Sequence, residues 1–220
     1  YQVLREYKAK YPDKPIVALF KDAAASGGYY IAMAADYLVA HPTSITGSIG
    51  VISMYLTVED LLGKIGVETV VLKSGNSKDI GSPFRKMTQP EKEFMQNIID
   101  RMYQRFVDTV YENRKSATGL SRGQLAQVAD GRILTGEQAL KEKLVDATGY
   151  LADAFSKSRE LAKLPDARLI KYRKKSGILE TAFRIESPTG QLQQLADFVL
   201  QSGTGKFMYL WMPAVIKDER

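Results

Sequence analysis

The stretch KDAAASGGYY, residues 21–30, organises the rest of this sequence. It follows the apolar run 16–20, which is typical of a buried parallel strand, and precedes the small-residue segment 31–35, which favours a buried helix. A serine at such a strand-to-helix junction can point its hydroxyl out of the end of a sheet. The two glycines after Ser26 let another backbone come close and leave amide N–H groups free to bind an anion. The alternative is that Ser26 is the N-cap of an ordinary helix.

The composition of the 220-residue chain is that of a globular protein, with 45% hydrophobic and 25% charged residues. The absence of cysteine excludes disulfides and thiolate metal sites, and the single histidine excludes a cluster of several histidines around a metal. We therefore expect no cofactor. The net charge of +6 is spread along the chain. Its densest basic run, residues 171–175, is explained most simply by a solvated strand end or linker, the alternative being a surface for anionic lipid or nucleic acid.

No apolar run approaches the roughly 20 residues that are needed to cross a bilayer, and no signal peptide is present. The sequence begins without Met at residues 1–7, in what reads as the middle of a helix. We therefore expect a fragment of a longer protein.

Strand and helix patterns alternate along the first half of the chain. Besides residues 16–20, the runs 37–40 and 67–72 have the apolar and β-branched composition of strands. Residues 58–65 favour a short helix that ends at Gly66. This alternation predicts a parallel α/β sheet.

The second half of the chain is predicted to be mainly helical. Apolar residues recur at helical spacing from Phe94 to Val110, which predicts a long amphipathic helix that starts near Gln89. Further helices are expected over residues 121–129, 135–139, 151–164, 177–184 and 189–202, and short strands over 132–134 and 169–172.

A nucleophilic serine needs a base, and the usual base is histidine. His41 is the single histidine, and a lone histidine is more often structural than catalytic. A lysine can serve if it is neutral, but deprotonating an ordinary lysine at pH 7 costs roughly 4–5 kcal/mol. Such a lysine must lie in an apolar pocket away from carboxylates, or beside another cation.

The polar loop 73–83 contains two lysines, Lys73 and Lys78. Lys78 lies between small residues and follows a predicted core strand, at the same sheet edge as Ser26. A carboxylate close to Lys78 would raise its pKa, so its neighbour Asp79 would have to point away. Taken alone, Lys78 is explained more simply as a surface lysine.

Several ordered blocks together resemble the S49-type Ser–Lys peptidases, the signal peptide peptidase A (SppA) family. The serine block is ASGGYYIA at residues 25–32, followed by AAD at 34–36, and the next is TGSIGV at 46–51. The lysine block runs from residue 73 to 80 and is followed by SPFR at 82–85. The remaining blocks are DGR at 130–132, TGEQA at 135–139, LVD at 144–146 and YLWMP at 209–213.

The resemblance implies a role for four residues. Ser26 matches the nucleophile and Lys78 the general base, while Ser48 matches a hydroxyl that orients the lysine amine. Gly27 matches one N–H donor of the oxyanion hole. The spacing of Ser26 and Lys78 is similar to that of single-domain members, although the working pair can also form across a subunit interface.

The fold that the resemblance implies is α/β, the ClpP/crotonase-like spiral of βαβ units. We expect the peptidase domain to cover residues 1–173 and a helical extension to cover residues 174–220 and dock on the core or a neighbouring subunit. The family's upstream strand and its glycine-rich turn, with the second oxyanion donor, are expected before Tyr1. At position 143 this chain has lysine where members commonly carry glycine.

The function implied is a serine endopeptidase that degrades remnant signal peptides, assembled as a homo-oligomeric ring. We expect the parent protein to be anchored in a membrane by a segment outside this chain, with its catalytic domain on the extracytoplasmic side. Two alternatives stay open: a catalytically silent assembly module of the same fold, and an acyl-CoA enzyme of crotonase type. The GTGK run at residues 203–206 lacks the spacing of a nucleotide-binding loop, and we expect no nucleic-acid partner.

Overall fold

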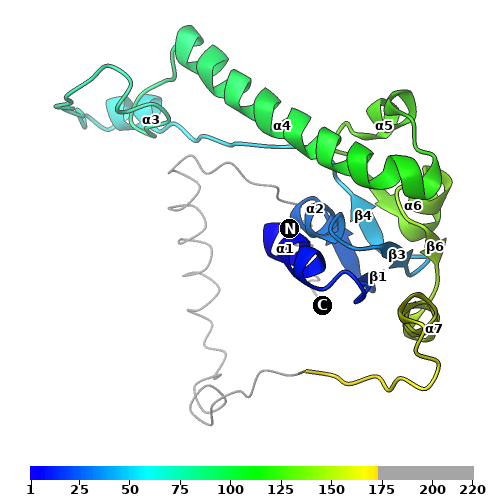
Figure 1. Ribbon diagram of the computed structural model, residues 1–220. Coiled ribbons are helices and arrows are strands. Elements are labelled where there is room, and N and C mark those ends of the chain that lie inside the picture. The colour runs from blue at the N-terminus through cyan, green and yellow to red at the C-terminus, as the bar shows by residue number, and fades with distance from the viewer. Residues whose placement is uncertain (173–220) are drawn as a thin grey trace, which may run out of the picture. The chain divides into compact units, whose positions relative to one another are not determined.

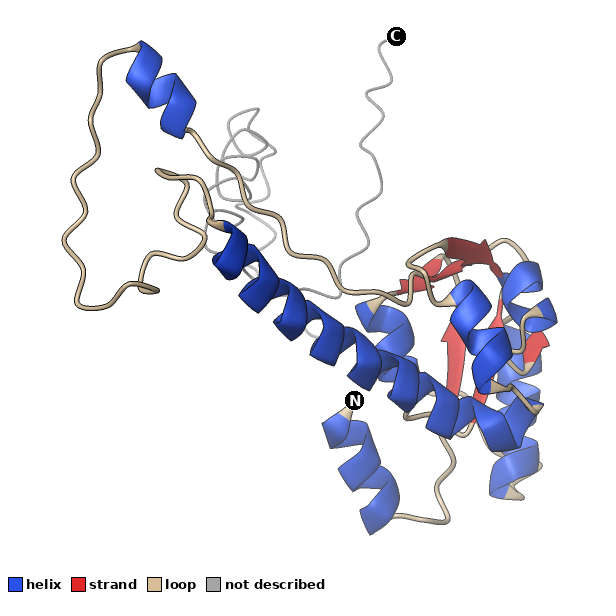
Figure 2. Cartoon of the chain, turned by 90° about the horizontal axis from the view of Figure 1, so that it is seen from above, coloured by secondary structure: helices blue, strands red, loops and turns tan. Residues whose placement is uncertain are grey.

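The computed structural model describes residues 1–172, shown in Figure 1 and, from above, in Figure 2. These residues form two units. The first unit contains residues 1–52 and 99–169, and the second contains residues 53–98 and 170–172. The predicted extension at residues 174–220, with its helices and its YLWMP cluster, lies outside the described residues.

The first unit contains two three-stranded sheets, of which the strands β1, β3, β4 and β6 are labelled in Figure 1. One sheet is parallel throughout and has the order β1 (Val17–Phe20), β3 (Tyr37–Ala40) and β6 (Ala147–Thr148). In the other sheet, β2 (Ala23–Ala25) pairs in parallel with β4 (Ile45–Gly47), and β4 pairs antiparallel with β5 (Ile133–Thr135). The mixed α/β fold expected from the alternating pattern is therefore confirmed.

Helices surround these strands, as Figure 2 shows for the first unit in blue and red. Two helices belong to the N-terminal part, α1 (Gln2–Lys10) and α2 (Gly27–Ala32). The others are α4 (Gln89–Thr118), which begins in the second unit, α5 (Arg122–Val128), α6 (Gly136–Lys141) and α7 (Leu151–Ala162).

Local sequence explains where two of the short helices begin. The Ser121 hydroxyl accepts a hydrogen bond from the backbone N–H of Gln124, whose side chain accepts one from the N–H of Ser121. Thr135 and Gln138 form the same reciprocal capping box at the start of α6. Each box satisfies two backbone donors, which fixes the start of a helix too short to be stable alone.

The core lies between the parallel sheet and the helices α2, α4, α5 and α6. Tyr29 is fully buried at its centre, and its ring meets Phe20 edge-on. The Tyr29 hydroxyl donates a 2.7 Å hydrogen bond to the carbonyl of Leu144. Burial raises the pKa of this hydroxyl well above its ordinary value, so Tyr29 stays a neutral donor.

A buried ion pair joins α4 to the parallel sheet. Arg114 and Asp146 are 3% and 8% exposed at their side chains and make two hydrogen bonds, of 2.8 and 3.1 Å. Asp146 also accepts a 2.7 Å hydrogen bond from the backbone N–H of Leu38, and its own N–H donates to the Leu38 carbonyl. One carboxylate therefore ties α4, β3 and the segment before β6 together.

The second unit contains the short helix α3 (Glu59–Lys64) and an extended, irregular chain. The helix ends as predicted, because Gly66 adopts a positive φ of 73° just after it. The strand predicted over residues 67–72 is wrong: these residues are exposed and form no strand. Their β-branched composition favours a pleated, half-buried surface, but such a strand forms only when a partner strand pairs with it.

A second predicted strand, over residues 169–172, is also wrong, because these residues are exposed and irregular. Conversely, the strands β2 and β4 were not predicted. Alanine has low β propensity, and residues 41–50 read as a polar connection. Pairing between the two segments, rather than local preference, makes them strands.

We expect Asp146→Ala to destabilise the first unit strongly, because it leaves Arg114 buried without its counter-charge. Removing one partner of a buried pair costs about 3–5 kcal/mol. Urea unfolding followed by circular dichroism measures the loss. Glu112→Ala on α4, the helix that carries Arg114, is the control, since Glu112 forms an exposed pair with Lys115. Equal losses in the two variants would contradict the role given to Asp146.

Candidate active site

Ser26 occupies a sharp strand-to-helix junction, as the sequence indicated, in a strained backbone conformation. The elements on either side are β2 and α2, however, and not a strand at residues 16–20 and a helix at residues 31–35 as predicted. The Ser26 φ of 51° and ψ of −114° lie in a region that costs non-glycine residues on the order of 1–3 kcal/mol. Two hydrogen bonds hold this conformation: the Ser26 N–H donates to the Gly47 carbonyl at 2.9 Å, and its carbonyl accepts from the Tyr30 N–H at 2.8 Å. Strain of this kind at a strand-to-helix turn is typical of a serine nucleophile.

The alternative interpretation, in which the Ser26 side chain caps α2, is wrong. Ser26 stands at the N-cap position of α2, but its side chain makes no capping hydrogen bond. The residue is only 1% exposed, so its hydroxyl lies in a largely desolvated environment. A hydroxyl that does not cap its helix is available for another role.

Ser48 occupies the equivalent position one strand away. It follows β4 as Ser26 follows β2, its φ is also 51°, and it is 9% exposed. Its backbone N–H donates a 2.7 Å hydrogen bond to the carbonyl of Arg132. Ser48 therefore combines positive φ with low exposure in the same way as Ser26.

The parallel register of β2 and β4 aligns the two serines. Ala25 pairs with Gly47, so the next residue of each strand, Ser26 and Ser48, meets at the carboxyl end of the same ladder. Adjacent strands lie about 4.8 Å apart. Two hydroxyl-bearing residues are thus held side by side at the edge of a sheet where α/β proteins commonly bind ligands.

Two further hydroxyls hold this edge in place, and sequence reasoning missed both. Thr46 is fully buried and donates a 2.8 Å hydrogen bond to the carbonyl of Ala24, across the β2–β4 pair. Ser44 donates to the carbonyls of Phe20 and Lys21 at 2.7 and 2.9 Å, where the chain bends from β1 into β2. Their position in a polar connection was the available signal, but their partners are distant in sequence.

Gly27 is the first residue of α2, so its backbone N–H has no acceptor within the helix. Because Gly27 directly follows Ser26, this N–H is suited to bind the oxyanion that forms on a substrate carbonyl oxygen when the Ser26 hydroxyl attacks it. The structure therefore places three of the four predicted site residues, Ser26, Gly27 and Ser48, together in the first unit.

Lys78, the fourth predicted site residue, lies in the second unit. Its loop is irregular, as predicted, its backbone N–H donates to the Gly75 carbonyl at 3.1 Å, and its side chain is exposed. The carboxylate of Asp79 does point away from it, toward Arg85 and Lys73. The pairing of Lys78 with Ser26 stays a prediction.

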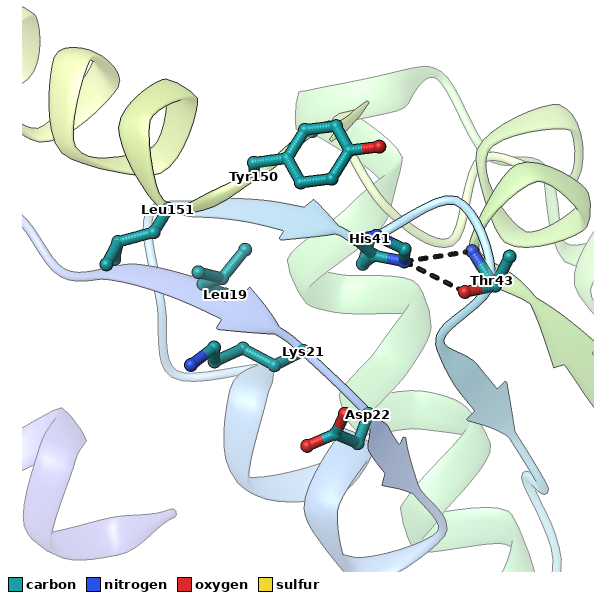
Figure 3. Close-up of a pocket in the computed structure, with 8 residues that line it drawn as sticks. Leu19, Lys21, Asp22, His41, Thr43, Tyr150 and Leu151 are labelled. Carbon is teal, nitrogen blue, oxygen red and sulfur yellow. Dashed lines mark hydrogen bonds between the residues drawn. The ribbon is translucent and has the colours of Figure 1, made fainter.

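His41 lies in a pocket of about 440 Å³ at the carboxyl end of the parallel sheet, shown in Figure 3. Its Nδ1 lies 2.9 Å from the Thr43 hydroxyl and accepts a weak hydrogen bond from the Thr43 N–H, drawn as dashed lines. Its ring meets Tyr150 edge-on. Neither serine lines this pocket, so the described structure gives His41 local partners of its own and no contact with Ser26.

Within residues 1–172, no group of three or more His, Cys, Asp or Glu residues could hold a metal ion. In the same residues, no helix combines the length and the apolar character that a membrane span requires.

We expect Gly47→Ala to destabilise the site and Gly28→Ala to be tolerated. Gly47 has a φ of 75°, and a Cβ there would lie 3.0 Å from the Arg132 carbonyl oxygen, so the loss should be about 1–3 kcal/mol. A Cβ at Gly28 would lie 3.9 Å from the Ala24 Cβ, an ordinary contact, and alanine should leave stability unchanged or raise it by up to about 1 kcal/mol. Thermal unfolding of both variants tests this difference. Similar midpoints would show that the backbone of Gly47 is not constrained as described.

The sequence is similar to those of known peptidases. A sequence profile of Peptidase family S49 matches residues 8–165. Protease 4 of Salmonella typhi is 35% identical over 195 residues, which are 88% of this chain and 30% of that protein. The chloroplastic serine protease SPPA of Arabidopsis thaliana is 35% identical over 162 residues, 73% of this chain and 23% of that protein. This chain spans at most about half of the length of the curated relatives that it matches.

Among solved structures, an enoyl-CoA hydratase from Thermoplasma volcanium aligns with 90% of this chain and 58% of its own, at 15% identity and a TM-score of 0.37. That similarity is too weak to support an argument. The profile match instead covers most of the chain and includes the junction at Ser26, the turn at Ser48 and the loop at Lys78. The chain belongs to peptidase family S49, whose expected ClpP/crotonase-like α/β architecture agrees with the parallel strand pairs observed.

Proposed function

We propose that this chain carries the catalytic machinery of a serine endopeptidase that uses a Ser–Lys dyad to degrade remnant signal peptides at a membrane. The observation that carries the proposal is the alignment of Ser26 and Ser48 at the carboxyl ends of β2 and β4, both with a φ of 51°. Strained backbone that the surrounding hydrogen bonds over-determine is characteristic of active sites. Membership of a peptidase family supports the reaction class.

In the proposed reaction, the Ser26 Oγ attacks the carbonyl carbon of the scissile peptide bond while its proton passes to the neutral amine of Lys78. The negative charge that develops on the carbonyl oxygen accepts a hydrogen bond from the Gly27 N–H. Lys78 then returns the proton to the leaving amine, and the tetrahedral intermediate collapses to an ester on Ser26. A water molecule, deprotonated by Lys78, hydrolyses this ester and restores the serine.

Ser48 orients the lysine amine in this proposal. Ser26 and Ser48 directly follow the paired residues Ala25 and Gly47. In this proposal the Ser48 hydroxyl hydrogen-bonds the amine that also reaches the Ser26 Oγ. A lysine side chain has several rotatable bonds, and a fixed hydrogen-bond partner reduces the conformational freedom that it must lose in the reaction.

The small residues around Ser26 support the proposed class of substrate. The strand that leads into Ser26 consists of Ala23–Ala25, and α2 continues with Ala32 into further small residues. Small side chains leave room for small or apolar substrate residues, which are the main content of signal peptides. The name of the Arabidopsis relative, a serine protease, agrees with the nucleophile proposed.

We also propose, from family membership, that the working protein is a homo-oligomeric ring and acts at a membrane surface. The anchor would be a segment outside this chain, and the catalytic domain would face the extracytoplasmic side. Sedimentation of the full-length protein, and protease accessibility in intact and permeabilised cells, test these two points.

The dyad is tested by substitutions in the full-length protein. Ser26→Ala and Lys78→Ala should each lower kcat/KM for an apolar peptide substrate by at least about 10²–10⁴-fold, because each removes a group that transfers or accepts the proton. His41→Ala should leave kcat/KM largely intact. Activity that survives Lys78→Ala but is lost in His41→Ala would replace the Ser–Lys dyad by a Ser–His pair.

An acylating, serine-directed probe separates this proposal from the silent-module alternative. Labelling of Ser26, identified by mass spectrometry and absent in Ser26→Ala, is the expected result. A full-length, folded protein that fails to label would favour a binding or assembly role for the same fold.

We expect Ser48→Ala to be slower but active. Losing a hydrogen bond to a charged or proton-transferring amine costs about 1.5–3 kcal/mol, which is roughly a 10- to 150-fold decrease in kcat. Ser48→Thr keeps the hydroxyl and is the matched variant, although the positive φ makes threonine less favourable. A Ser48→Ala enzyme with unchanged kcat would contradict the orienting role.

A further inference from the structure

A four-residue ion cluster lies beside Lys78 in the second unit. Arg85 binds both carboxylate oxygens of Asp79, through Nε at 2.8 Å and Nη2 at 2.8 Å. Lys73 donates to the same carboxylate from the other side, also at 2.8 Å. The Asp79 side chain is only 12% exposed, so its two oxygens are enclosed by two cations.

The same guanidinium binds a second carboxylate. Arg85 donates to Glu91 through Nη1 at 2.8 Å and Nη2 at 2.5 Å. Glu91 stands in the first turn of α4 and also accepts a 2.9 Å hydrogen bond from the Thr88 N–H. Arg85 therefore connects the loop of Lys78 to the start of α4, because its planar guanidinium makes two hydrogen bonds to each of the two carboxylates.

These contacts favour the charged form of both carboxyl groups in the cluster. Hydrogen bonds from Arg85 and then from Lys73 keep the pKa of the Asp79 carboxyl well below its usual range. Arg85 and the Thr88 N–H lower the pKa of Glu91 to about 2. With Lys73 and Arg85 positive and Asp79 and Glu91 negative, the cluster has no net charge at neutral pH.

Lys78 takes no part in the cluster, although Asp79 is its neighbour in sequence. No hydrogen bond or ion pair between Lys78 and Asp79 is formed in the described residues, where the carboxylate faces Arg85 and Lys73. An unrestrained carboxylate could approach the Lys78 amine, and an opposite charge within 4–6 Å shifts a pKa by about 1–3 units. Each unit of increase makes the neutral amine about tenfold rarer.

We propose that Arg85, supported by Lys73 and Glu91, is a positioning residue that keeps the Asp79 carboxylate away from Lys78 and so lets Lys78 lose its proton. This inference rests on the proposed function, in which Lys78 is the general base. It assigns to Arg85 an effect on the proton affinity of Lys78 without contact with substrate.

The test is the pH dependence of kcat/KM of the full-length protein, measured at constant, low ionic strength because salt screens exposed charges. Arg85→Gln removes two of the three side-chain hydrogen bonds that hold the Asp79 carboxylate, and it leaves the cluster with one excess negative charge. The acid limb of the profile should move upward by about one pH unit, with activity about tenfold lower at pH 7 and recovered at high pH.

Lys86→Gln is the matched control. It removes one positive charge from the same unit, but Lys86 pairs with the exposed Asp60 and not with Asp79. Its acid limb should stay where it is in the unmodified protein. A shift of the same size in both variants would attribute the effect to overall charge and overturn the role of Arg85.

Asp79→Asn and the double variant complete the test. Asp79→Asn leaves one excess positive charge beside Lys78 and should move the acid limb downward, by about half a unit. Combined with Arg85→Gln, it removes both the cation and the carboxylate and should return the limb toward its original position. A purely structural role of the cluster would lower activity at every pH and would not reverse direction between the two single variants.

The outcomes separate this inference from the function on which it rests. An unshifted profile in Arg85→Gln, with Lys78→Ala inactive, overturns the positioning role and leaves the dyad in place. Full activity in Lys78→Ala overturns the proposed function itself. If circular dichroism shows that Arg85→Gln does not fold, Asp79→Asn decides: a downward shift supports the inference and an unshifted limb overturns it.

Discussion

The candidate site depends on the parallel pairing of β2 with β4. Only three residue pairs form this ladder, yet it brings Ser26 and Ser48 to the same end of the sheet. The buried hydrogen bond from Thr46 to the Ala24 carbonyl and the bond from the Ser26 N–H to the Gly47 carbonyl fix the two strands on each other. Because these bonds over-determine the backbone, both serines can remain at positive φ, where an isolated serine would relax.

Contacts elsewhere in the first unit stabilise the strands to which this pair is connected. Asp146 connects α4 with the middle strand of the parallel sheet, through Arg114 and the Leu38 N–H. Ser44, just before β4, then binds the bend between β1 and β2 through the carbonyls of Phe20 and Lys21. Buried charge and buried hydroxyls thus position the edge at which Ser26 lies, while the apolar core around Tyr29 supplies most of the stability.

In the second unit, charged side chains surround the residue next to Lys78. A Ser–Lys mechanism needs a lysine that can lose its proton, yet the sequence puts a carboxylate next to Lys78. In the proposed mechanism the two cationic partners of Asp79 remove this conflict, and one of them, Arg85, is itself bound by Glu91. The proposed chemistry at Ser26 and the ion cluster near Lys78 are therefore two parts of one requirement, a strong nucleophile at neutral pH.

The sequence by itself determined the α/β class, the long helix α4, the existence of helices that begin near Ser121 and Thr135, and the strand-to-helix junction at Ser26. These depend on local patterns, namely apolar periodicity, capping residues and glycines, which are legible along a single chain. The sequence prediction was wrong at residues 67–72 and 169–172, which have the composition of strands but pair with no partner strand. It also missed β2, whose alanines have low strand propensity, and β4, which lies in a polar connection; the two form strands because they pair with each other. Only the tertiary structure decided that Ser26 does not cap its helix, that Ser48 stands beside it, and that Asp79 faces Arg85. Each of these depends on contacts between residues distant in sequence or on a side-chain direction, which no local pattern encodes.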